Sequence, residues 1–203
     1  MPFGLCNAPV TFQREMNRIF FDLIGRCMFV YIDDLIIFSE SFSSHIRDLK
    51  MVFKIIQDNG LKVNIEKCSF FKNEVKLLGH ILTTNGISPI PDKVYAISNW
   101  IAPKNITQLK SFLGAIGYYR KFIKSFAQIA SPLFYLLKKD IPFKWNEGCD
   151  IAFNNLKRRL IEAPILSAPD YSFPFIIRTD ASRDGLGGVL LQAKDNSIEL
   201  PIY

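Results

Sequence analysis

Residues 28–38 read Met-Phe-Val-Tyr-Ile-Asp-Asp-Leu-Ile-Ile-Phe, so two adjacent carboxylates, Asp33 and Asp34, interrupt an otherwise apolar run. The β-branched and aromatic residues on both sides predict two strands that bury one face, with the aspartates at the turn between them. Neighbouring carboxylates repel each other, and no Lys or Arg lies close to them in the sequence. A bound cation is therefore the expected partner, and all-oxygen ligands suit Mg²⁺ or Mn²⁺. An ordinary polar hairpin turn is the alternative, because aspartate is a common turn residue.

The composition indicates a folded chain of one or two domains. The 203 residues are 49% hydrophobic and 22% charged, and they include 18 Phe, which is unlike a disordered protein. No apolar stretch reaches the length of a membrane span, so no membrane partner is expected. Four scattered cysteines without a Cys-x-x-Cys pair, and only two histidines, argue against a zinc site. We expect a reduced, intracellular protein, in a cytoplasmic particle or the nucleus, without a targeting signal.

The positive charge is concentrated in one part of the chain. The formal net charge is +6, and residues 101–160 contain eleven Lys or Arg against three acids. A basic segment beside a carboxylate site suggests that a polyanion lies across the first and reacts at the second. The alternative is a solvated basic surface.

The N-terminal part predicts helices packed on antiparallel strands. A turn-rich opening precedes a helix that Gly25 ends, and a second helix is expected between the caps Ser43 and Ser44 and the Asn59-Gly60 pair. Alternating polarity predicts a strand over residues 61–66, and residues 75–82 read as a further strand that runs to a turn at Asn85-Gly86. This order of elements is typical of an α+β layer.

The next region is predicted to be helical, and one of its helices has two clearly different faces. Asn105 is its predicted N-cap. A projection at 3.6 residues per turn places six apolar residues on the inner side (Leu109, Phe112, Leu113, Ile116, Tyr119, Ile123). The outer side carries lysines, glycines and a tyrosine (Lys110, Gly114, Gly117, Tyr118, Lys121). A glycine on an exposed helix flank costs about 1 kcal/mol relative to Ala. Close approach of a sugar-phosphate backbone would explain the two glycines, with Tyr118 as a flat surface and the lysines neutralising phosphate. Close packing against another helix is the alternative.

The C-terminal part predicts a short helix that starts at Ser131-Pro132, a brief strand over 143–145 and a helix capped by Asn146. A linker with Pro164 and Pro169 separates these from two strands, over 173–179 and 189–192, with a glycine-rich turn and bulge at 185–188. A third strand begins near Ile198. Because the chain opens inside a loop and closes on an incomplete sheet, we expect it to be a piece of a longer parent.

Three segments together resemble the reverse transcriptase of gypsy-type long-terminal-repeat retrotransposons. They are residues 1–13 (MPFGLCNAPVTFQ), the Tyr31-Ile32-Asp33-Asp34 box, and Leu78-Gly79-His80 with the helical region after it. The tail, Thr179-Asp180-Ala181-Ser182 with residues 185–192, is similar to the opening of the ribonuclease H domain that follows in those polyproteins. The resemblance covers nearly the whole chain in the right order.

The resemblance implies a role for each matching residue. Asp33 and Asp34 would hold two catalytic divalent metals, Mg²⁺ or Mn²⁺, and Asp180 would be the first metal carboxylate of ribonuclease H. Tyr31 would lie beside the primer terminus, and Phe3 and Gly4 beside the incoming nucleotide and the template base. Leu78, Gly79 and His80 resemble the primer grip. Lys110, Gly114 and Tyr118 resemble the thumb helix that follows the duplex minor groove, and Lys121 is expected to bind nucleic acid with them. The implied partners are an RNA template, a DNA primer, an RNA–DNA hybrid, deoxynucleoside triphosphates and the rest of the Pol polyprotein.

The resemblance implies an α+β fold, a partial right-hand polymerase with palm remainder, helical thumb and connection, followed by the first strands of a ribonuclease H-like α/β domain. The expected divisions are residues 1–88 for the palm, 89–168 for thumb and connection, and 169–203 for the start of ribonuclease H. The family's polymerase site uses a third carboxylate from an upstream strand, and its ribonuclease H site uses further acids from downstream. We therefore expect the isolated chain to be inactive. A catalytically incomplete remnant that only binds nucleic acid is the alternative function.

Overall fold

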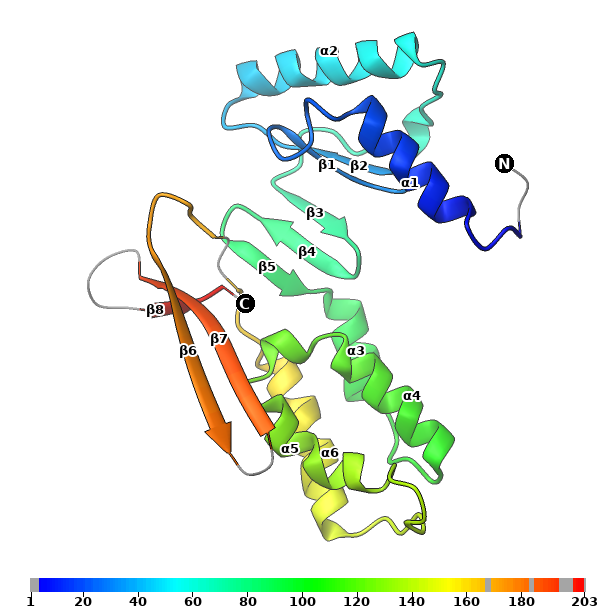
Figure 1. The fold of residues 1–203 in the computed structure, drawn as a ribbon, viewed down its shortest axis with the longest axis vertical. Helices are drawn as coiled ribbons and strands as arrows, with labels where there is room; N and C mark the ends of the chain where they lie inside the picture. Colours follow the sequence, from blue (N-terminus) through cyan, green and yellow to red (C-terminus); the bar gives the residue numbers. More distant parts are fainter. Residues whose placement is uncertain (1–3, 167–168, 183–184, 194–198, 203) are drawn as a thin grey trace. The chain divides into compact units, whose positions relative to one another are not determined.

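The computed structural model describes residues 4–166, 169–182, 185–193 and 199–202. The chain divides into two compact units, Met1–Phe70 and Phe71–Tyr203, and each combines helices with antiparallel strands (Figure 1). The expected α+β class is thus confirmed. Within the described residues, no helix has both the length and the apolar character needed to cross a membrane.

The first unit builds a two-stranded hairpin against two helices. Its elements in chain order are α1 (Ala8–Ile19), β1 (Met28–Tyr31), β2 (Asp34–Ile37), α2 (Phe42–Asp58) and the 3₁₀ turn η1 (Ile65–Lys67). Because strand side chains alternate, Met28 and Val30 face the helices while Phe29 and Tyr31 remain exposed. The core is formed by apolar residues of the helices, the connecting loop and β1, namely Met16, Phe20, Leu23, Cys27, Met28, Val52 and Ile56.

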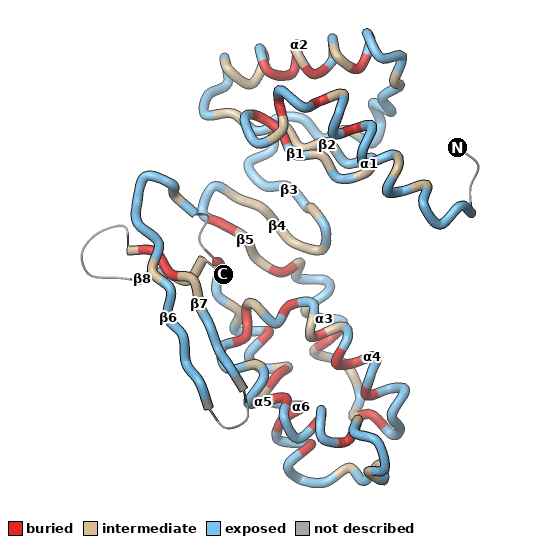
Figure 2. The backbone as a smooth tube through the Cα atoms, viewed as in Figure 1, coloured by how far each residue is buried: buried red, intermediate tan, exposed pale blue. Residues whose placement is uncertain are grey.

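The second unit combines two small sheets with a helical core. Its elements are β3 (Glu74–Leu77), β4 (His80–Thr83), β5 (Gly86–Pro89), α3 (Pro91–Ser98), α4 (Ile106–Gly117), η2 (Arg120–Phe122), α5 (Phe126–Tyr135), α6 (Glu147–Ile161), β6 (Phe175–Ser182), β7 (Gly185–Ala193) and β8 (Glu199–Pro201). Strands β3–β5 form one meander and β6–β8 another. Buried residues recur along the helices of this unit (Figure 2), where Leu109, Phe112 and Ile116 of α4 are fully buried together with Leu156 of α6.

One contact joins segments of this unit that lie far apart in the sequence. Ile87 of β5 and Leu166 exchange two backbone hydrogen bonds of 2.8 and 2.9 Å. A Cβ added to Gly86 would lie 2.0 Å from the Leu166 carbonyl oxygen, and the φ of Gly86 is +135°. The Asn85-Gly86 turn therefore needs glycine both for its backbone angle and for this close approach.

Several predicted caps and elements are confirmed. Asn105 and Asn146 accept hydrogen bonds from the amides of Gln108 and Cys149 and so cap α4 and α6. All six residues predicted for the inner side of the α4 region are buried. The α4 helix is shorter than expected, however, because it ends at Gly117 and Lys121 lies in η2.

Other predicted elements in the N-terminal half are wrong. The N-cap of α2 is Ser41, whose side chain and that of Ser44 complete a capping box, rather than Ser43 or Ser44. Residues 61–66 form no strand, because Asn64 accepts a hydrogen bond from the Glu66 amide and starts η1 instead. The strand expected over 75–82 is broken into β3 and β4 by a turn at Leu78-Gly79.

Three predictions in the C-terminal half are also wrong. Helix α5 begins at Phe126 and includes Pro132 in its interior, because burial of Ala130 and Leu133 outweighs the helix-breaking tendency of proline. Residues 143–145 adopt no regular structure. The glycine-rich stretch 185–188 belongs to β7, where it pairs with residues 179–182 of β6.

Candidate functional site

The two carboxylates lie at the β1–β2 turn. Ile32 and Asp33 are the turn residues, and Asp34 begins β2 opposite Tyr31. Both aspartates are exposed, and neither forms an ion pair with any described Lys, Arg or His. The expected hairpin is confirmed, and its adjacent carboxylates are open to solvent.

Asp33 and Asp34 offer carboxylate oxygens to a hard cation, but two carboxylates alone do not complete its ligand set. The described residues contain no cluster of three or more His, Cys, Asp or Glu side chains that could hold a metal ion. Exposed, unneutralised carboxylates are the donors that Mg²⁺ accepts, and Mg²⁺ is commonly held by one or two carboxylates together with substrate phosphates and water. The two carboxylates therefore fit a divalent ion whose other ligands come from a substrate and from water.

A glutamine from α1 holds the turn in place. Gln13 accepts a hydrogen bond from the Ile32 amide at 2.5 Å on Oε1, and its Nε2 donates to the Val30 carbonyl at 3.2 Å. Nε2 also donates to Asn17 Oδ1 at 2.7 Å. One amide thus satisfies two backbone groups on either side of Tyr31 and links the N-terminal motif to the carboxylates.

The backbone at Ile32 explains why such support is needed. Its φ is +52°, whereas that of Asp33 is negative. A positive φ at the first turn residue alone is the signature of a type II′ turn, which normally has glycine there. For a β-branched residue this conformation is a steric outlier, and such strain tends to occur at functional sites.

The residues expected beside the nucleotide are described only in part. Tyr31 is 48% exposed, next to Asp34 across the hairpin, and Phe29 and Phe38 stack on the same open face with ring centroids 5.0 Å apart. Gly4 has a φ of +98°, which favours glycine. Phe3 lies outside the described residues.

The expected primer-grip residues form the β3–β4 turn of the second unit. Leu78 and Gly79 have φ values of +44° and +71°, and Leu77 pairs with His80. Positive φ at both central residues is the signature of a type I′ turn, for which Asn-Gly is the preferred sequence. Leu78 is 44% exposed. An exposed leucine thus occupies a strained position at the tip of this hairpin.

The same turn is hydrogen-bonded to the end of α4. The hydroxyl of Tyr118 donates to the Leu78 carbonyl, and that of Tyr119 donates to the Gly79 carbonyl at 3.0 Å. The Leu78 carbonyl lies 2.8 Å from His80 Nδ1, which fits the tautomer that carries its proton there. His80 Nε2 is then a bare acceptor, buried and without a hydrogen-bond partner among the described residues. Burial lowers the pKa of His80, and the nearby charge of Lys121 lowers it further.

The surface of α4 carries the expected exposed residues. Lys110 and Gly114 are exposed one turn apart, and Tyr118 is 52% exposed at the C-cap. A Cβ on Gly114 or Gly117 would meet no described atom within 4 Å, so nothing in the described chain packs against these glycines. The helix-packing explanation is therefore not supported within this unit.

Two further predicted residues lie apart from that helix. Lys121 is half-buried in η2 with its Nζ 5.3 Å from the centroid of the Phe122 ring, and burial lowers its pKa. Asp180 is exposed in β6 opposite Gly187. It belongs to no acidic cluster in the described chain.

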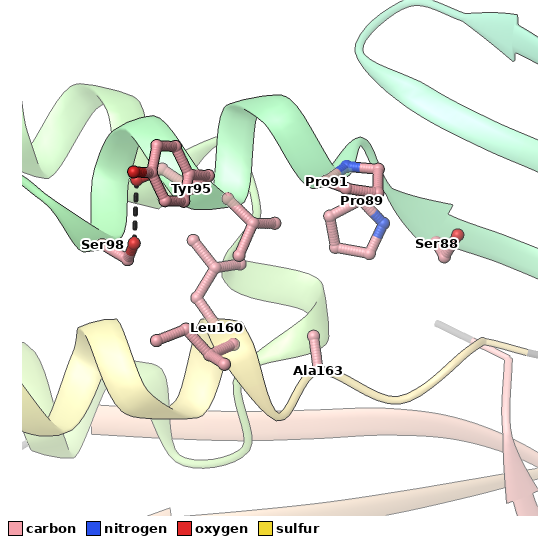
Figure 3. Close-up of a pocket in the computed structure, with 9 residues that line it drawn as sticks. Ser88, Pro89, Pro91, Tyr95, Ser98, Leu160 and Ala163 are labelled. Atoms are coloured by element: carbon pink, nitrogen blue, oxygen red, sulfur yellow. Dashed lines mark hydrogen bonds between the residues drawn. The ribbon is translucent and has the colours of Figure 1, made fainter.

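The structure also has an open hollow of about 560 Å³ that does not fit a reactive site. It lies between α3, along its whole length, and the C-terminal end of α6 (Figure 3), and its lining residues are uncharged (Ser88, Pro89, Pro91, Val94, Tyr95, Ser98, Leu160, Ile161, Ala163). Within it, Ser98 Oγ donates to the Tyr95 carbonyl at 2.8 Å. The charged and strained residues lie instead at the two hairpin turns and on α4.

Two family matches define the class of the protein. Residues 1–82 match the family described as reverse transcriptase (RNA-dependent DNA polymerase), and residues 145–203 match the RNase H-like domain found in reverse transcriptase. The first segment contains the carboxylate hairpin and the β3–β4 turn, and the second contains α6 and β6–β8. The chain thus contains a segment of the reverse transcriptase family followed by a segment of the RNase H-like family found in reverse transcriptase.

Similar proteins specify the kind of reverse transcriptase. The chain is 46% identical over 193 residues to the Retrovirus-related Pol polyprotein from transposon 297 of Drosophila melanogaster, with 95% of this chain and 18% of that protein covered. It is 42% identical over 204 residues to the corresponding polyprotein from transposon gypsy of the same species, with 95% and 20% covered. The Transposon Tf2-3 polyprotein of Schizosaccharomyces pombe is 35% identical over 202 residues, with 100% and 15% covered.

Solved structures agree with this assignment. A foamy viral protease-reverse transcriptase in complex with double-stranded DNA has a TM-score of 0.87 and 26% identity, covering 99% of this chain and 35% of that one. The same kind of enzyme in complex with an RNA/DNA hybrid has a TM-score of 0.81 and 26% identity, covering 100% and 27%. The gypsy-type resemblance is therefore confirmed. The chain contains parts of the reverse transcriptase and RNase H-like domains of a retrotransposon Pol polyprotein, and it spans a fifth or less of these three relatives.

Proposed function

We propose that this chain supplies the metal-binding carboxylate hairpin and the primer-binding surface of an RNA-directed DNA polymerase. The observation that carries the proposal is the pair Asp33 and Asp34, adjacent, exposed and unneutralised at a turn that Gln13 fixes by two hydrogen bonds. Such a turn presents negative charge where a polymerase needs divalent cations.

The proposed reaction is template-directed nucleotidyl transfer onto a primer, which copies RNA into DNA. Divalent ions, when bound, would supply activation of the primer 3′ hydroxyl and charge stabilisation of the leaving pyrophosphate. In the intact polyprotein, Asp33 and Asp34 provide two of the carboxylates that hold them. Tyr31 lies beside the primer terminus, and Phe3 and Gly4 border the incoming deoxynucleoside triphosphate and the template base.

The second unit would hold the primer–template duplex. The exposed Leu78 at the β3–β4 turn contacts the primer end, and Lys110, Gly114 and Tyr118 follow the minor groove. The open space around the Gly114 Cβ position supports this assignment, because a nucleic-acid backbone can approach there and no described protein atom does. The similar structures are complexes with double-stranded DNA and with an RNA/DNA hybrid, which supports the choice of substrates.

We further propose that the C-terminal segment contributes to cleavage of RNA in the hybrid. Asp180, exposed in β6, is the first metal carboxylate of that site. In functional terms the chain then divides into palm (1–88), thumb and connection (89–168) and the start of ribonuclease H (169–203). Because neither the β1–β2 turn nor β6 gathers three acidic ligands in the described chain, the isolated 203 residues are expected to be inactive.

Primer extension by the intact polyprotein tests the proposal. With Mg²⁺ and a primed RNA template, Asp33→Asn should lower incorporation by at least about 10²-fold, since charge stabilisation at a transferring phosphate is lost. Asp58→Asn, at the exposed end of α2, is the matched control and should leave the rate unchanged. Equal activity of both variants would contradict the assigned role of the hairpin.

The alternative, a remnant that only binds nucleic acid, is favoured by the exposed face of α4. Lys110→Ala should weaken duplex binding about equally for all sequences and reduce the salt-dependence slope by about one unit. Duplex binding with this behaviour, but without incorporation by the unmodified polyprotein, would support the binding remnant.

A further inference from the structure

The β3–β4 turn and the C-terminus of α4 are joined by an aromatic clamp formed by His80, Tyr118, Tyr119 and Phe122. Two consecutive carbonyls of the turn, those of Leu78 and Gly79, accept hydrogen bonds from the hydroxyls of two consecutive tyrosines. These contacts bridge 40 residues of sequence. The turn and the two tyrosines belong to the same compact unit, Phe71–Tyr203.

The aromatic rings of the clamp also pack against one another, in addition to the two hydroxyl hydrogen bonds. The His80 ring centroid lies 5.3 Å from that of Tyr118, 5.7 Å from Tyr119 and 5.6 Å from Phe122. Tyr119 and Phe122 are 4% and 3% exposed and belong to the helical core. The clamp is therefore anchored in the buried helical core of this unit.

Glycine is favoured at the turn both by its backbone angle and by this packing. A Cβ on Gly79 would lie 3.0 Å from Tyr118 Cε1 and 3.3 Å from its hydroxyl oxygen. The neighbouring Leu78 has a φ of +44°, a conformation that leucine rarely adopts. The clamp holds this strained turn closed, because opening it would break the tyrosine hydrogen bonds and expose the buried rings.

The clamp also changes the role assigned to Tyr118. Its hydroxyl is used inside the chain by the Leu78 carbonyl, and one face of its ring packs against His80. Half of the residue remains exposed beside the Lys110 and Gly114 face. Tyr118 can thus contact a duplex with its ring while its hydroxyl fixes the turn.

We infer that Tyr118 and Tyr119 are positioning residues that make the primer-contacting turn and α4 one rigid body, so that a duplex held along α4 has its primer end set in register by Leu78. This inference rests on the proposed polymerase function. It separates two roles. Lys110 determines how tightly the duplex binds, whereas the tyrosine hydroxyls determine how often the bound primer end is correctly placed for reaction.

The kinetic test uses the intact polyprotein with Tyr118→Phe, Tyr119→Phe and the double variant. Each change removes one hydroxyl and keeps the ring, and Tyr95→Phe, at a residue that is 72% exposed, is the matched control. The double variant should lower the single-turnover rate of nucleotide addition by about tenfold, with duplex Kd within about twofold. Tyr95→Phe should change neither value. An unchanged rate, or a Kd that rises as much as the rate falls, would overturn the inference.

A structural measurement separates failure of the clamp from failure of the polymerase proposal. In the 203-residue chain, amide hydrogen exchange at His80, which closes the turn opposite Leu77, should be about tenfold faster in the double variant and unchanged in Tyr95→Phe. Faster exchange in a protein that incorporates no nucleotide would refute the polymerase role alone. Unchanged exchange would refute the clamp whatever the activity. Tyr118→Phe, at a half-exposed position, provides the same readout if the double variant does not fold.

Discussion

The β1–β2 turn and the β3–β4 turn both place an apolar residue at a positive φ, Ile32 at +52° and Leu78 at +44°, yet different side chains hold them. The first is fixed by one polar side chain, Gln13, from the preceding helix. The second is fixed by tyrosine hydroxyls from a helix that follows 40 residues later and by rings rooted in a buried core. Each conformation costs about 1–2 kcal/mol for a residue with a Cβ, so each needs its support.

The difference follows from what each turn presents. The first carries two exposed carboxylates, and apolar rings packed around them would raise the cost of keeping them charged. A glutamine amide can fix the backbone and leave the carboxylates solvated. The second turn presents Leu78 and no charge, so it can be held by aromatic packing.

Among the residues that support the two turns, Gln13 gives the largest expected effect on replacement, and its loss would break the comparison at the first turn. Gln13→Leu leaves the part-buried Ile32 amide and Val30 carbonyl without their partner, at about 1 kcal/mol for each group. We expect the rate of nucleotide addition in the intact polyprotein to fall by about 10²-fold, with little change in duplex affinity. Single-turnover kinetics and duplex titration measure the two quantities.

Asn17→Ala is the control for Gln13. It removes only the 2.7 Å bond that orients the glutamine amide, so both backbone bonds of the turn can persist. The rate should fall by about threefold or less, because one exposed hydrogen bond contributes about 0.5–1 kcal/mol. A Gln13→Leu variant as active as Asn17→Ala would show that Ile32 holds its conformation without help.

Replacement of Gly79 tests the second turn by adding a single methyl group. Gly79→Ala combines a φ of +71° with a Cβ only 3.0 Å from Tyr118 Cε1. We expect the free energy of unfolding of the second unit to fall by about 1–2 kcal/mol. Urea denaturation followed by Trp fluorescence reports this unit, because Trp100 and Trp145 both lie in it. An unchanged midpoint would mean that the clamp yields at no cost.

The carboxylate hairpin could be predicted from the sequence, but its support could not. Asp33 and Asp34 within an apolar run reveal the turn by local pattern alone. Gln13 is one of many polar residues on an amphipathic helix, and its role depends on a contact across 17 to 19 residues that no local pattern contains. The available signal was its place at the end of the residue 1–13 motif.

The β3–β4 turn shows the opposite difficulty. Leu78-Gly79 lacks the Asn-Gly signature, so its apolar neighbours read as one continuous strand. The pairing of β3 with β4 and the contact with Tyr118 and Tyr119 stabilise the chain reversal there. The inner face of α4 was predictable because helical periodicity is local, and the two asparagine caps were predictable for the same reason.

A smaller effect of opposite sign is expected at Gly114, which lies in the same unit as Gly79. Gly114→Ala meets no described atom within 4 Å and should raise the free energy of unfolding by about 1 kcal/mol through helix propensity. The added methyl group should nevertheless weaken duplex binding if a nucleic-acid backbone approaches this face. Trp fluorescence and duplex titration measure the two changes. Improved stability with unchanged affinity would remove Gly114 from the binding surface.

The smallest expected effect is a pH dependence that distinguishes the second turn from the first. Burial lowers the pKa of His80 below its ordinary value of 6.5, and the charge of Lys121 in η2 lowers it further, while the bond to the Leu78 carbonyl acts in the opposite direction. Between the two pKa values the unfolded chain binds more protons than the folded one, so stability should fall as the pH drops below 6.5. The bare Nε2, buried among aromatic rings, has no described acceptor for the added proton.

The His80→Phe variant removes this titration and keeps an aromatic ring in the clamp. The free energy of unfolding of the second unit, measured by Trp fluorescence between pH 7 and pH 5.5, should therefore vary less with pH in the variant than in the unmodified chain. Other groups that titrate in this range affect both proteins equally, so the difference between the two slopes isolates His80. Equal slopes would mean that protonated His80 is accommodated in the folded turn. The aromatic clamp would then hold the β3–β4 turn without requiring a neutral imidazole.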